Sequence, residues 1–399
     1  MRELFESFYR RLVNTDTRFT RYLYDVIHWD ARLIGILGAR GAGKTTMLLQ
    51  RILKTFGGTP TQALYVSLDN LYFSTHTLLD LTREFYQSGG TYLFLDEVHR
   101  YSTWSVELKQ IYDDYPTLHI IFTGSSLLQV ENGEADLSRR ATLYYLNGMS
   151  FREFLQFDKG ITLPVYSLEQ ILSHHTAIAH EVIQELHPLA AFNEYLRYGY
   201  YPFYKEDIDA YPSKLLATFN QIIELDLPAV VDIEYTTIQR IKKLFAIIAQ
   251  LVPLIPNISA LSRDLNTTRL SLLNYLYYLG RARAILMIDK TSSGLKPMAK
   301  PEKIYLGNTN YAYSFGRENT NIGSIRETFF VNQLQATHNV AYAPSNADFR
   351  VDGRYTFEIG GAGKSHRQIQ GIPDAYLALD DIEQGFGNEI PLYLFGMMY

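Results

Sequence analysis

Eight consecutive residues of this chain form a glycine-rich loop of a kind that binds phosphate. They are Gly38-Ala39-Arg40-Gly41-Ala42-Gly43-Lys44-Thr45, which fit the pattern G-x-x-x-x-G-K-T. Glycines allow positive φ, so that successive backbone N–H groups can surround an anion at the start of a helix. In this pattern the lysine reaches the β- and γ-phosphates of a nucleotide, and the threonine hydroxyl binds Mg²⁺. The loop therefore predicts a nucleoside triphosphate site.

Two acidic residues, Asp96 and Glu97, follow the apolar residues 92–95. In an open α/β sheet, ligands bind at the carboxyl ends of the strands. We expect Asp96 to hold Mg²⁺ through water and Glu97 to polarise the attacking water. The alternative is that both acids simply start a helix, where carboxylates are favoured. The upstream phosphate loop favours the catalytic interpretation.

The elements around the loop have the order that the pattern requires. An apolar strand is expected at residues 32–37, and a helix with one apolar face is expected at residues 46–54. Strand, loop and helix together are the structural context in which this motif binds nucleotide. The residues expected to bind the nucleotide are Gly38, Ala39, Arg40, Gly41, Ala42, Gly43, Lys44, Thr45 and Thr46, with Thr45 and Asp96 as the metal-binding pair.

A further buried strand, residues 119–122, ends in Thr123-Gly124-Ser125-Ser126. Ser125 or Ser126 could contact the γ-phosphate from the adjacent strand. Either serine could equally be the N-cap of a following helix, because serine is strongly preferred there. Both interpretations stay open.

The composition excludes several classes of protein. The chain has 399 residues, a formal net charge of −5 and no cysteine. Disulfides, thiolate zinc sites and cysteine nucleophiles are therefore excluded. The acidic balance argues against a protein devoted to nucleic-acid phosphates. No signal peptide or membrane span is recognisable, so we expect a cytoplasmic protein with no membrane partner.

The motifs resemble those of an AAA-type P-loop ATPase family of bacteria and archaea. That family joins an ATPase core, a helical lid, a winged helix and a C-terminal restriction-endonuclease-like domain. The matching stretches cover nearly the whole chain and are residues 38–46, 65–69, 93–97, 123–126, 137–140, 149–154, 195–196, 199–202 and 303–306. The resemblance implies ATP and Mg²⁺ as cofactors.

The resemblance predicts an α/β multidomain fold in four parts. They are a parallel-sheet P-loop core with an N-terminal helix, a helical lid, a winged helix, and an α/β nuclease-like domain that is degenerate. Their expected ranges are 1–155, 156–235, 236–298 and 299–399.

Arg140 is the arginine expected to complete the ATPase site. It follows the sensor strand and lies where the resembling family has Gly-Arg, although this chain has Arg139-Arg140 there. Such an arginine stabilises γ-phosphate charge, either in its own site or across a subunit interface. The alternative is a plain surface pair of arginines.

The winged-helix segment has little basic charge. The helix expected to read DNA, residues 267–279, carries only Arg269 as a cation, while Arg281 and Arg283 follow it. DNA-reading helices usually present a basic stripe. A structural or protein-binding role is therefore favoured over DNA contact.

The nuclease resemblance places Glu327, Asp348 and Glu358 at the metal-binding positions. Three carboxylates could hold Mg²⁺. Gly360 stands where the lysine of Glu-x-Lys is expected, and Lys364 is the residue that could substitute from a loop. Without that lysine in place, we expect a degenerate binding or scaffold domain rather than an active nuclease.

The function predicted from the sequence is Mg²⁺-dependent ATP hydrolysis coupled to rearrangement between the core and the C-terminal domains. One alternative is a nucleotide-dependent switch or scaffold with little turnover. The other is a DNA-processing enzyme that uses the C-terminal domain as a nuclease. A protein partner of unknown identity is expected, and a homo-oligomer is compatible with the sequence.

Overall fold

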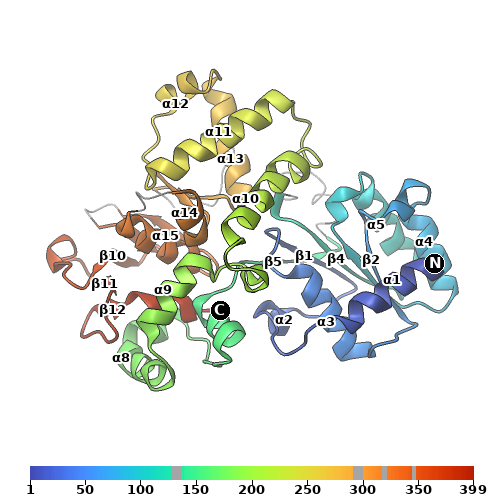
Figure 1. Cartoon of the computed structure of the whole chain (residues 1–399), viewed down its shortest axis with the longest axis horizontal. Helices are drawn as coiled ribbons and strands as arrows, with labels where there is room; N and C mark the ends of the chain where they lie inside the picture. The colour runs from blue at the N-terminus through green and yellow to red at the C-terminus, as the bar shows by residue number, and fades with distance from the viewer. Residues whose placement is uncertain (128–136, 138, 291–299, 317–320, 344–346) are drawn as a thin grey trace. The chain divides into compact units, whose positions relative to one another are not determined.

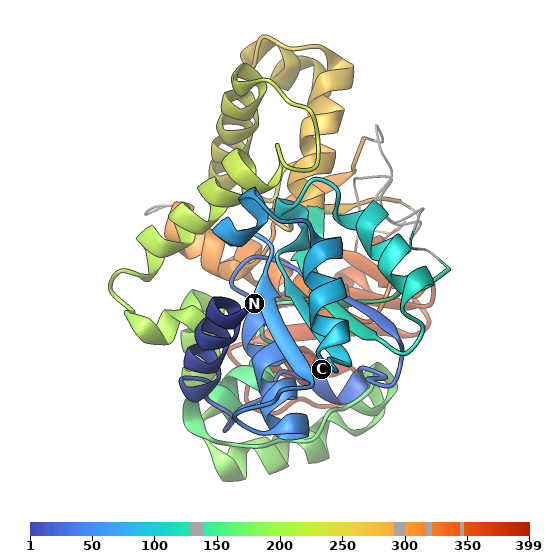
Figure 2. The ribbon, with the colours of Figure 1, turned by 90° about the vertical axis from the view of Figure 1, so that its right-hand side faces the viewer.

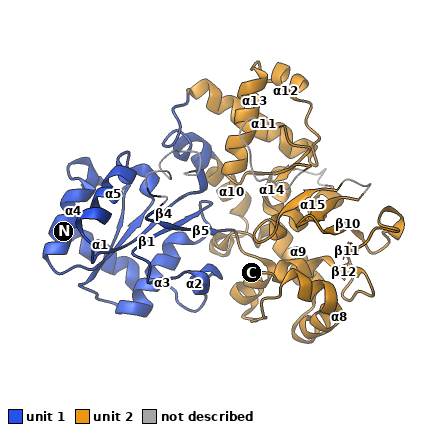
Figure 3. Ribbon diagram, turned by 180° about the vertical axis from the view of Figure 1, so that it is seen from behind, with its two compact units in different colours: residues 1–147, 220–233 blue, residues 148–219, 234–399 orange. Residues whose placement is uncertain are grey.

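The structure is a computed structural model that describes residues 1–127, 137, 139–290, 300–316, 321–343 and 347–399. The chain forms two compact units, coloured separately in Figure 3. Unit 1 contains Met1–Asn147 and Asn220–Ile233, and unit 2 contains Gly148–Phe219 and Glu234–Tyr399. The first unit is therefore built from two segments that are distant in the sequence.

Unit 1 is organised around a five-stranded sheet with the strand order β2-β3-β4-β1-β5. Every neighbouring pair in this sheet is parallel. Because the strands are parallel, the loops that follow them meet at one edge. The strands are β1 (Leu33–Gly38), β2 (Ala63–Ser67), β3 (Tyr92–Asp96), β4 (His119–Ser125) and β5 (Thr142–Leu146), of which Figure 1 labels β1, β2, β4 and β5.

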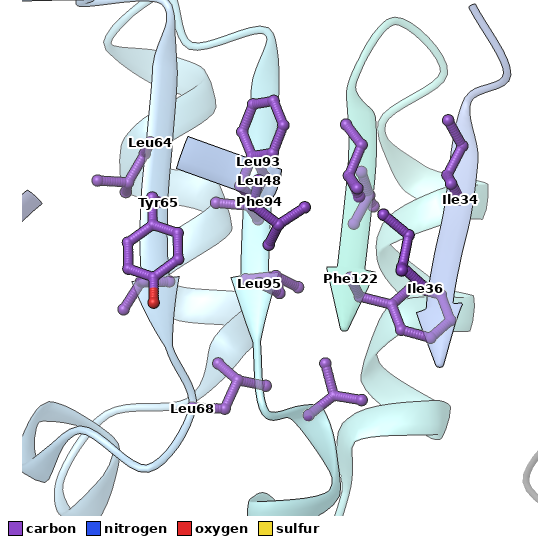
Figure 4. Close-up of a cluster of buried hydrophobic side chains, with 14 of the residues drawn as sticks. Ile34, Ile36, Leu48, Leu64, Tyr65, Leu68, Leu93, Phe94, Leu95 and Phe122 are labelled. Atoms are coloured by element: carbon purple, nitrogen blue, oxygen red, sulfur yellow. The ribbon is translucent and has the colours of Figure 1, made fainter. Parts of the chain in front are cut away.

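The strands of unit 1 are buried because their side chains are apolar on both faces, as a parallel sheet requires. Ile34, Ile36, Leu93 and Leu95 expose none of their surface, and Phe122 exposes 1%. Figure 4 shows these side chains on adjacent strands, packed between the sheet and its helices. This rigid sheet fixes the positions of the loops at its edge.

The helices of unit 1 cover both faces of the sheet. Helices α1 and α3 contact each other and β2, and α4 contacts α5. The chain moves from β1 to β2 in one direction across the sheet and then returns, so right-handed crossovers place α3 and α4 on opposite faces. The helical elements are α1 (Arg2–Val13), α2 (Leu23–Val26), α3 (Lys44–Phe56), η1 (Leu71–Ser74), α4 (Leu78–Gln87), η2 (Val98–Arg100) and α5 (Trp104–Asp114).

Helix α1 forms because its apolar residues fall on one stripe. Leu4, Phe8 and Leu12 recur every four residues and are all buried. The Phe8 ring stacks on the ring of Tyr65 in β2, with 6.2 Å between centroids. Figure 2 shows this helix, in dark blue, beside the sheet.

The second segment of unit 1, residues 220–233, contains the π-helical turn η6 (Ile222–Asp226). It lies within the range predicted for the helical lid, and the structure groups it with the core instead. Turns of this wide type are rare and occur frequently at functional sites.

The first part of unit 2 is helical, with an antiparallel ladder between β6 and β7. Strand β7 lies beyond residue 298, the predicted end of the winged helix. The elements are α7 (Phe151–Phe154), η4 (Leu155–Lys159), α8 (Leu168–Glu185), α9 (Pro188–Tyr198), η5 (Pro202–Glu206), α10 (Tyr211–Gln221), α11 (Tyr235–Leu251), α12 (Ile258–Asp264), α13 (Arg269–Arg281), β6 (Ile285–Ile288) and β7 (Lys303–Leu306).

The last part of unit 2 contains a mixed five-stranded sheet with the order β12-β11-β10-β9-β8. Strands β10, β11 and β12 are parallel, whereas β8, β9 and β10 are antiparallel. Helix α15 contacts β10. The elements are α14 (Thr309–Phe315), α15 (Ile322–Leu334), β8 (Val340–Tyr342), β9 (Phe349–Val351), β10 (Tyr355–Gly361), η8 (His366–Gln368), β11 (Ala375–Asp380), β12 (Glu389–Pro391) and η9 (Leu392–Met397).

None of the helices in the described part of the chain is long and apolar enough to cross a membrane.

Candidate functional site

The glycine-rich loop joins β1 to α3 at the carboxyl edge of the unit 1 sheet. Gly43 is the N-cap of α3 and has φ of +100°, in the left-handed region that side chains disfavour. Gly38 has no room for a side chain, because a Cβ there would lie 2.4 Å from the backbone oxygen of Leu146 in β5. The loop shape therefore depends on these two glycines, and the N-terminus of α3 opens into it.

Lys44 is buried inside the loop. Its Nζ donates to the carbonyl oxygens of Gly38, at 2.8 Å, and of Ala39, at 3.1 Å. Burial lowers the pKa of Lys44, while the nearby carboxylates of Glu97 and Asp96 oppose that shift. The ammonium group is thus held at the position from which it can exchange these carbonyls for phosphate oxygens.

Asp96, the last residue of β3, lies beside the start of α3. The Thr45 hydroxyl donates to Oδ2 of Asp96 at 2.6 Å, and the Tyr65 hydroxyl donates to the same oxygen at 2.7 Å. The Thr123 hydroxyl donates to Oδ1. The structure therefore brings together the two residues predicted to bind Mg²⁺, and hydroxyl and carboxylate oxygens are ligands that this ion prefers.

Glu97 has φ of +54°, an uncommon conformation for a residue with a side chain. Its N–H donates to the Thr123 hydroxyl at 3.1 Å, which holds the backbone in this conformation. Its carboxylate lies 3.4 Å from Nε2 of His99 and 3.6 Å from the guanidinium of Arg40. Strain of this kind clusters at active sites.

A second carboxylate, that of Asp226, reaches the same place from residues 220–233. Its Oδ1 lies 2.6 Å from the Arg100 guanidinium, 3.4 Å from the Arg40 guanidinium and 3.5 Å from Nε2 of His99. Burial alone would raise the pKa of Asp226, but His99 and the two arginines lower it below its ordinary value. The group is therefore a buried anion at neutral pH.

Ser125 makes the contacts of a capping residue. Its hydroxyl accepts from the N–H of Leu127 at 3.3 Å, and its own N–H donates to Nδ1 of His99 at the same distance. Ser126 is also buried. The capping interpretation thus describes the observed bonds of Ser125, while its contact with γ-phosphate stays a prediction.

Arg140 does not lie at its own nucleotide site. It precedes β5 and pairs with Asp113 at the end of α5, with Nη2–Oδ2 of 2.9 Å. Thr142 is opposite Ile34 in the parallel ladder, so Arg140 is at the amino edge of the sheet, whereas the loop follows Gly38 at the other edge. At about 3.3 Å per residue, the paired strand from Ile34 to Gly38 alone separates the two edges by about 13 Å. The own-site alternative is therefore wrong for this structure.

Residues 30–155 match the family model of the AAA domain. The prediction of an AAA-type nucleotide-binding core is thereby confirmed for this segment. The predicted helical lid, winged helix and nuclease-like domain stay predictions.

One curated relative is an uncharacterized protein of Methanocaldococcus jannaschii, MJ1637. It is 29% identical over 288 residues, which is 68% of this chain and 60% of the relative. The chain thus covers less than two thirds of that protein's length.

Two solved structures are similar at low scores. The Aeropyrum pernix ORC1 protein in complex with DNA has a TM-score of 0.34 and 10% identity, over 79% of this chain and 92% of that chain. AMPPCP-bound DnaA from Aquifex aeolicus has a TM-score of 0.26 and 14% identity, over 69% and 86%. Neither likeness carries an argument about this chain.

The carboxylates predicted for unit 2 lie near each other but are partly neutralised. Lys303 Nζ lies 2.6 Å from Oε2 of Glu327, and Lys364 Nζ lies 2.5 Å from Oε1 of Glu358. Burial, followed by Glu327 and Glu358, raises the pKa of Asp348 to about 7. In the described ranges, no group of three or more His, Cys, Asp or Glu converges as a metal site requires. Within the described residues, Glu327, Asp348 and Glu358 are therefore not grouped as a metal site, which the sequence allowed but did not require.

The side chain of Lys364 packs against Gly360, in the space that a side chain at position 360 would fill. A Cβ at Gly360 would lie 2.6 Å from Cβ and 2.7 Å from Cγ of Lys364. The lysine of the loop thus fills the place of a side chain at position 360 and brings its charge to Glu358. That Lys364 substitutes for the lysine of Glu-x-Lys stays a prediction, and the observed contact is its ion pair with Glu358.

The sequence did not reveal several residues of the unit 1 site. Arg21 is buried and donates to the carbonyl of Ala42 in the loop and, at 2.8 Å, to that of Asn147. His99 and Thr123 lie close to predicted motifs, so proximity to Glu97 and Ser125 was a usable signal. No sequence signal pointed to Asp226, because it lies far along the chain from the phosphate loop and from Glu97.

Proposed function

We propose that unit 1 binds ATP with Mg²⁺ and hydrolyses it. The observation that carries the proposal is the joint placement of Lys44 in the loop, the Thr45–Asp96 pair beside it, and Glu97 directly after Asp96. The AAA-domain match over residues 30–155 supports it independently.

Each group of residues at the site would have its own role in binding and hydrolysing ATP. Backbone N–H groups of the loop and Lys44 bind and orient the phosphates. Thr45 and Asp96 would hold Mg²⁺, which supplies positive charge to the phosphate oxygens. Glu97 would orient the attacking water and accept a proton from it, because its carboxylate directly follows Asp96 at the carboxyl end of β3.

We propose further that hydrolysis is coupled to rearrangement of the parts of the chain. Residues 220–233 support this, since they place Asp226 beside the loop and are continuous at both ends with unit 2. The rival function is a switch that binds ATP and a partner with little turnover. DNA cleavage by residues 299–399 has less support, because Lys303 and Lys364 each neutralise one carboxylate.

The deciding experiment measures ATP binding by calorimetry and phosphate release by a steady-state assay. Lys44→Ala should abolish binding, because it removes the point charge that pairs with the phosphates. Glu97→Gln should bind ATP with Mg²⁺ normally and lose hydrolysis, whereas Asp96→Ala should also weaken the Mg²⁺-dependent part of binding.

The control is Glu84→Gln, an exposed glutamate on α4. Unchanged ATP affinity in Lys44→Ala would refute the site. Normal hydrolysis by Glu97→Gln would reduce Glu97 to a residue that starts a helical turn. Binding without turnover in the wild type would favour the switch.

A further inference from the structure

The side chain of Arg40 lies at the catalytic end of the loop. Arg40 is the third residue of the loop, and its Nη1 lies 3.6 Å from Glu97, the carboxylate proposed to orient the attacking water. Lys44 is also close enough to Asp226 for that carboxylate to affect its pKa. The guanidinium therefore stands where the γ-phosphate would meet the water.

The contacts of Arg40 are loose. Its Nη1 is 3.4 Å from Asp226 and 3.6 Å from Glu97, both longer than a good hydrogen bond between N–H and oxygen. Its side chain is 34% exposed. A guanidinium has five N–H donors, so this one keeps the capacity to bind a further anion.

Asp226 does not depend on Arg40. Its shortest ion pair, at 2.6 Å, joins Oδ1 to Arg100, and Nε2 of His99 lies 3.5 Å from the same oxygen. If Arg40 moved to a phosphate, Asp226 would keep these two partners and would not be left as an unpaired buried charge, which is costly. Arg40 is thus the exchangeable cation of the group, and Arg100 is the fixed one.

A site for phosphoryl transfer needs positive charge at the γ-phosphate, and arginine supplies it in many such sites. Arg140 lies at the opposite edge of the sheet and cannot supply it to its own site. Arg40 is a guanidinium within reach on the loop itself.

We propose that the Arg40 guanidinium contacts the γ-phosphate in its own site, and that Asp226 is a positioning residue that holds it when γ-phosphate is absent. The inference rests on the proposed function. ATP and ADP then differ in one specific way. The γ-phosphate takes Arg40 from Asp226, while ADP leaves the Arg40–Asp226 pair in place.

The test compares equilibrium binding of MgADP and of Mg²⁺ with β,γ-methylene ATP. Arg40→Gln should weaken binding of the ATP analogue about tenfold or more, because hydrogen bonds to charged groups are strong, and should change ADP affinity less than threefold. Arg40→Lys, which keeps the charge, should recover part of the loss. Turnover of ATP should also fall more in Arg40→Gln than in Arg40→Lys.

Asp226→Asn should increase the affinity for the ATP analogue relative to that for ADP. It removes a carboxylate that competes with the γ-phosphate for Arg40, so the ATP analogue should bind about threefold or more tightly relative to ADP. The matched controls are Arg83→Gln and Asp232→Asn, both exposed, which should leave the ratio of affinities unchanged.

An equal loss of ADP and ATP-analogue affinity in Arg40→Gln would make Arg40 a residue that only shapes the loop, and would overturn the inference. So would no loss at all. If the wild type bound neither nucleotide, the proposed function itself would fail. Thermal melts establish folding, and if Asp226→Asn is unfolded, the comparison of Arg40→Gln with Arg40→Lys still decides.

Discussion

Asp348 shows how one buried carboxyl links stability to pH. Burial, and then the charges of Glu327 and Glu358, raise its pKa to about 7 from an ordinary 3.8. Between these two values the folded chain keeps a proton that the unfolded chain has lost. The contribution of Asp348 to stability is therefore greatest below the lower value, falls as the pH rises between the two, and is lowest above about 7.

We expect Asp348→Asn to remove this dependence. The amide cannot ionise, so the variant should be more stable than the wild type at pH 8, by at most about 4 kcal/mol for a shift of about three units. At pH 4 the two should be similar. Thermal melts from pH 4 to 8 measure the difference.

Asp209→Asn, at an exposed position in unit 2, is the control and should track the wild type at every pH. Parallel curves for Asp348→Asn and the wild type would show that Asp348 ionises normally in the folded chain.

At the residue scale, local pattern predicted part of the site. Lys44, Thr45, Asp96 and Glu97 were predicted because each has a fixed spacing from a strand end, and the structure brings them together. Asp226 was not predicted, because a single aspartate in a helical stretch carries no local signal. Its role comes from tertiary contacts with Arg40, His99 and Arg100.

At the element scale, β1 and β5 meet where the loop begins. A Cβ on Gly38 would lie 2.4 Å from the backbone oxygen of Leu146 and 3.3 Å from its carbonyl carbon. Backbone cannot move aside as a flexible side chain can, so the two strands would have to separate.

We therefore expect Gly38→Ala to destabilise unit 1 by about 1–3 kcal/mol, as overpacking generally does. It should also weaken nucleotide binding by displacing the loop. Gly58→Ala is the matched control, because nothing lies within 4 Å of its Cβ position. Denaturant melts measure the free energy of unfolding, and ADP titrations measure nucleotide affinity. Equal values for Gly38→Ala and Gly58→Ala would contradict the prediction that a side chain at position 38 separates the strands.

Periodicity predicted the buried strands of unit 1 because parallel strands are continuous apolar runs. It could not predict which strands pair over long distances. Strand β7 pairs with β6 although residues 291–299, outside the described part, lie between them. The predicted boundary at residue 298 therefore falls between two strands of one ladder.

At the scale of the whole molecule, the sequence predicted an α/β chain of several parts but not the return of residues 220–233 to unit 1. That return is a tertiary event, since the apolar residues buried in this segment would suit a lid equally well, and the buried Asp226 carries no local signal of its partners. Ile222, Ile223 and Leu227 are all buried in the structure. The pattern shows that they are buried but does not identify what they contact.

The last prediction concerns Arg140 and the assembly of more than one chain. Because Arg140 lies at the amino edge of its own sheet, a direct contribution of Arg140 to catalysis would have to reach another subunit's site. If Arg140 contacts that site, Arg140→Ala should keep its ATP affinity and lose turnover by about a thousandfold. Mixing it with Lys44→Ala protein should restore turnover, since intact Arg140 of one variant then meets the intact loop of the other.

Arg139→Ala is the control, because Arg139 is exposed and adjacent. Normal turnover by Arg140→Ala would refute the interface role. Arg140 would then have a structural role that includes its surface ion pair with Asp113, and such pairs contribute little to stability. Loss of turnover without restoration, in a mixture shown by subunit exchange to contain mixed oligomers, would also contradict it. In that case removal of the Arg140–Asp113 pair would be acting on the fold of unit 1, and a lower melting temperature for Arg140→Ala would confirm that explanation.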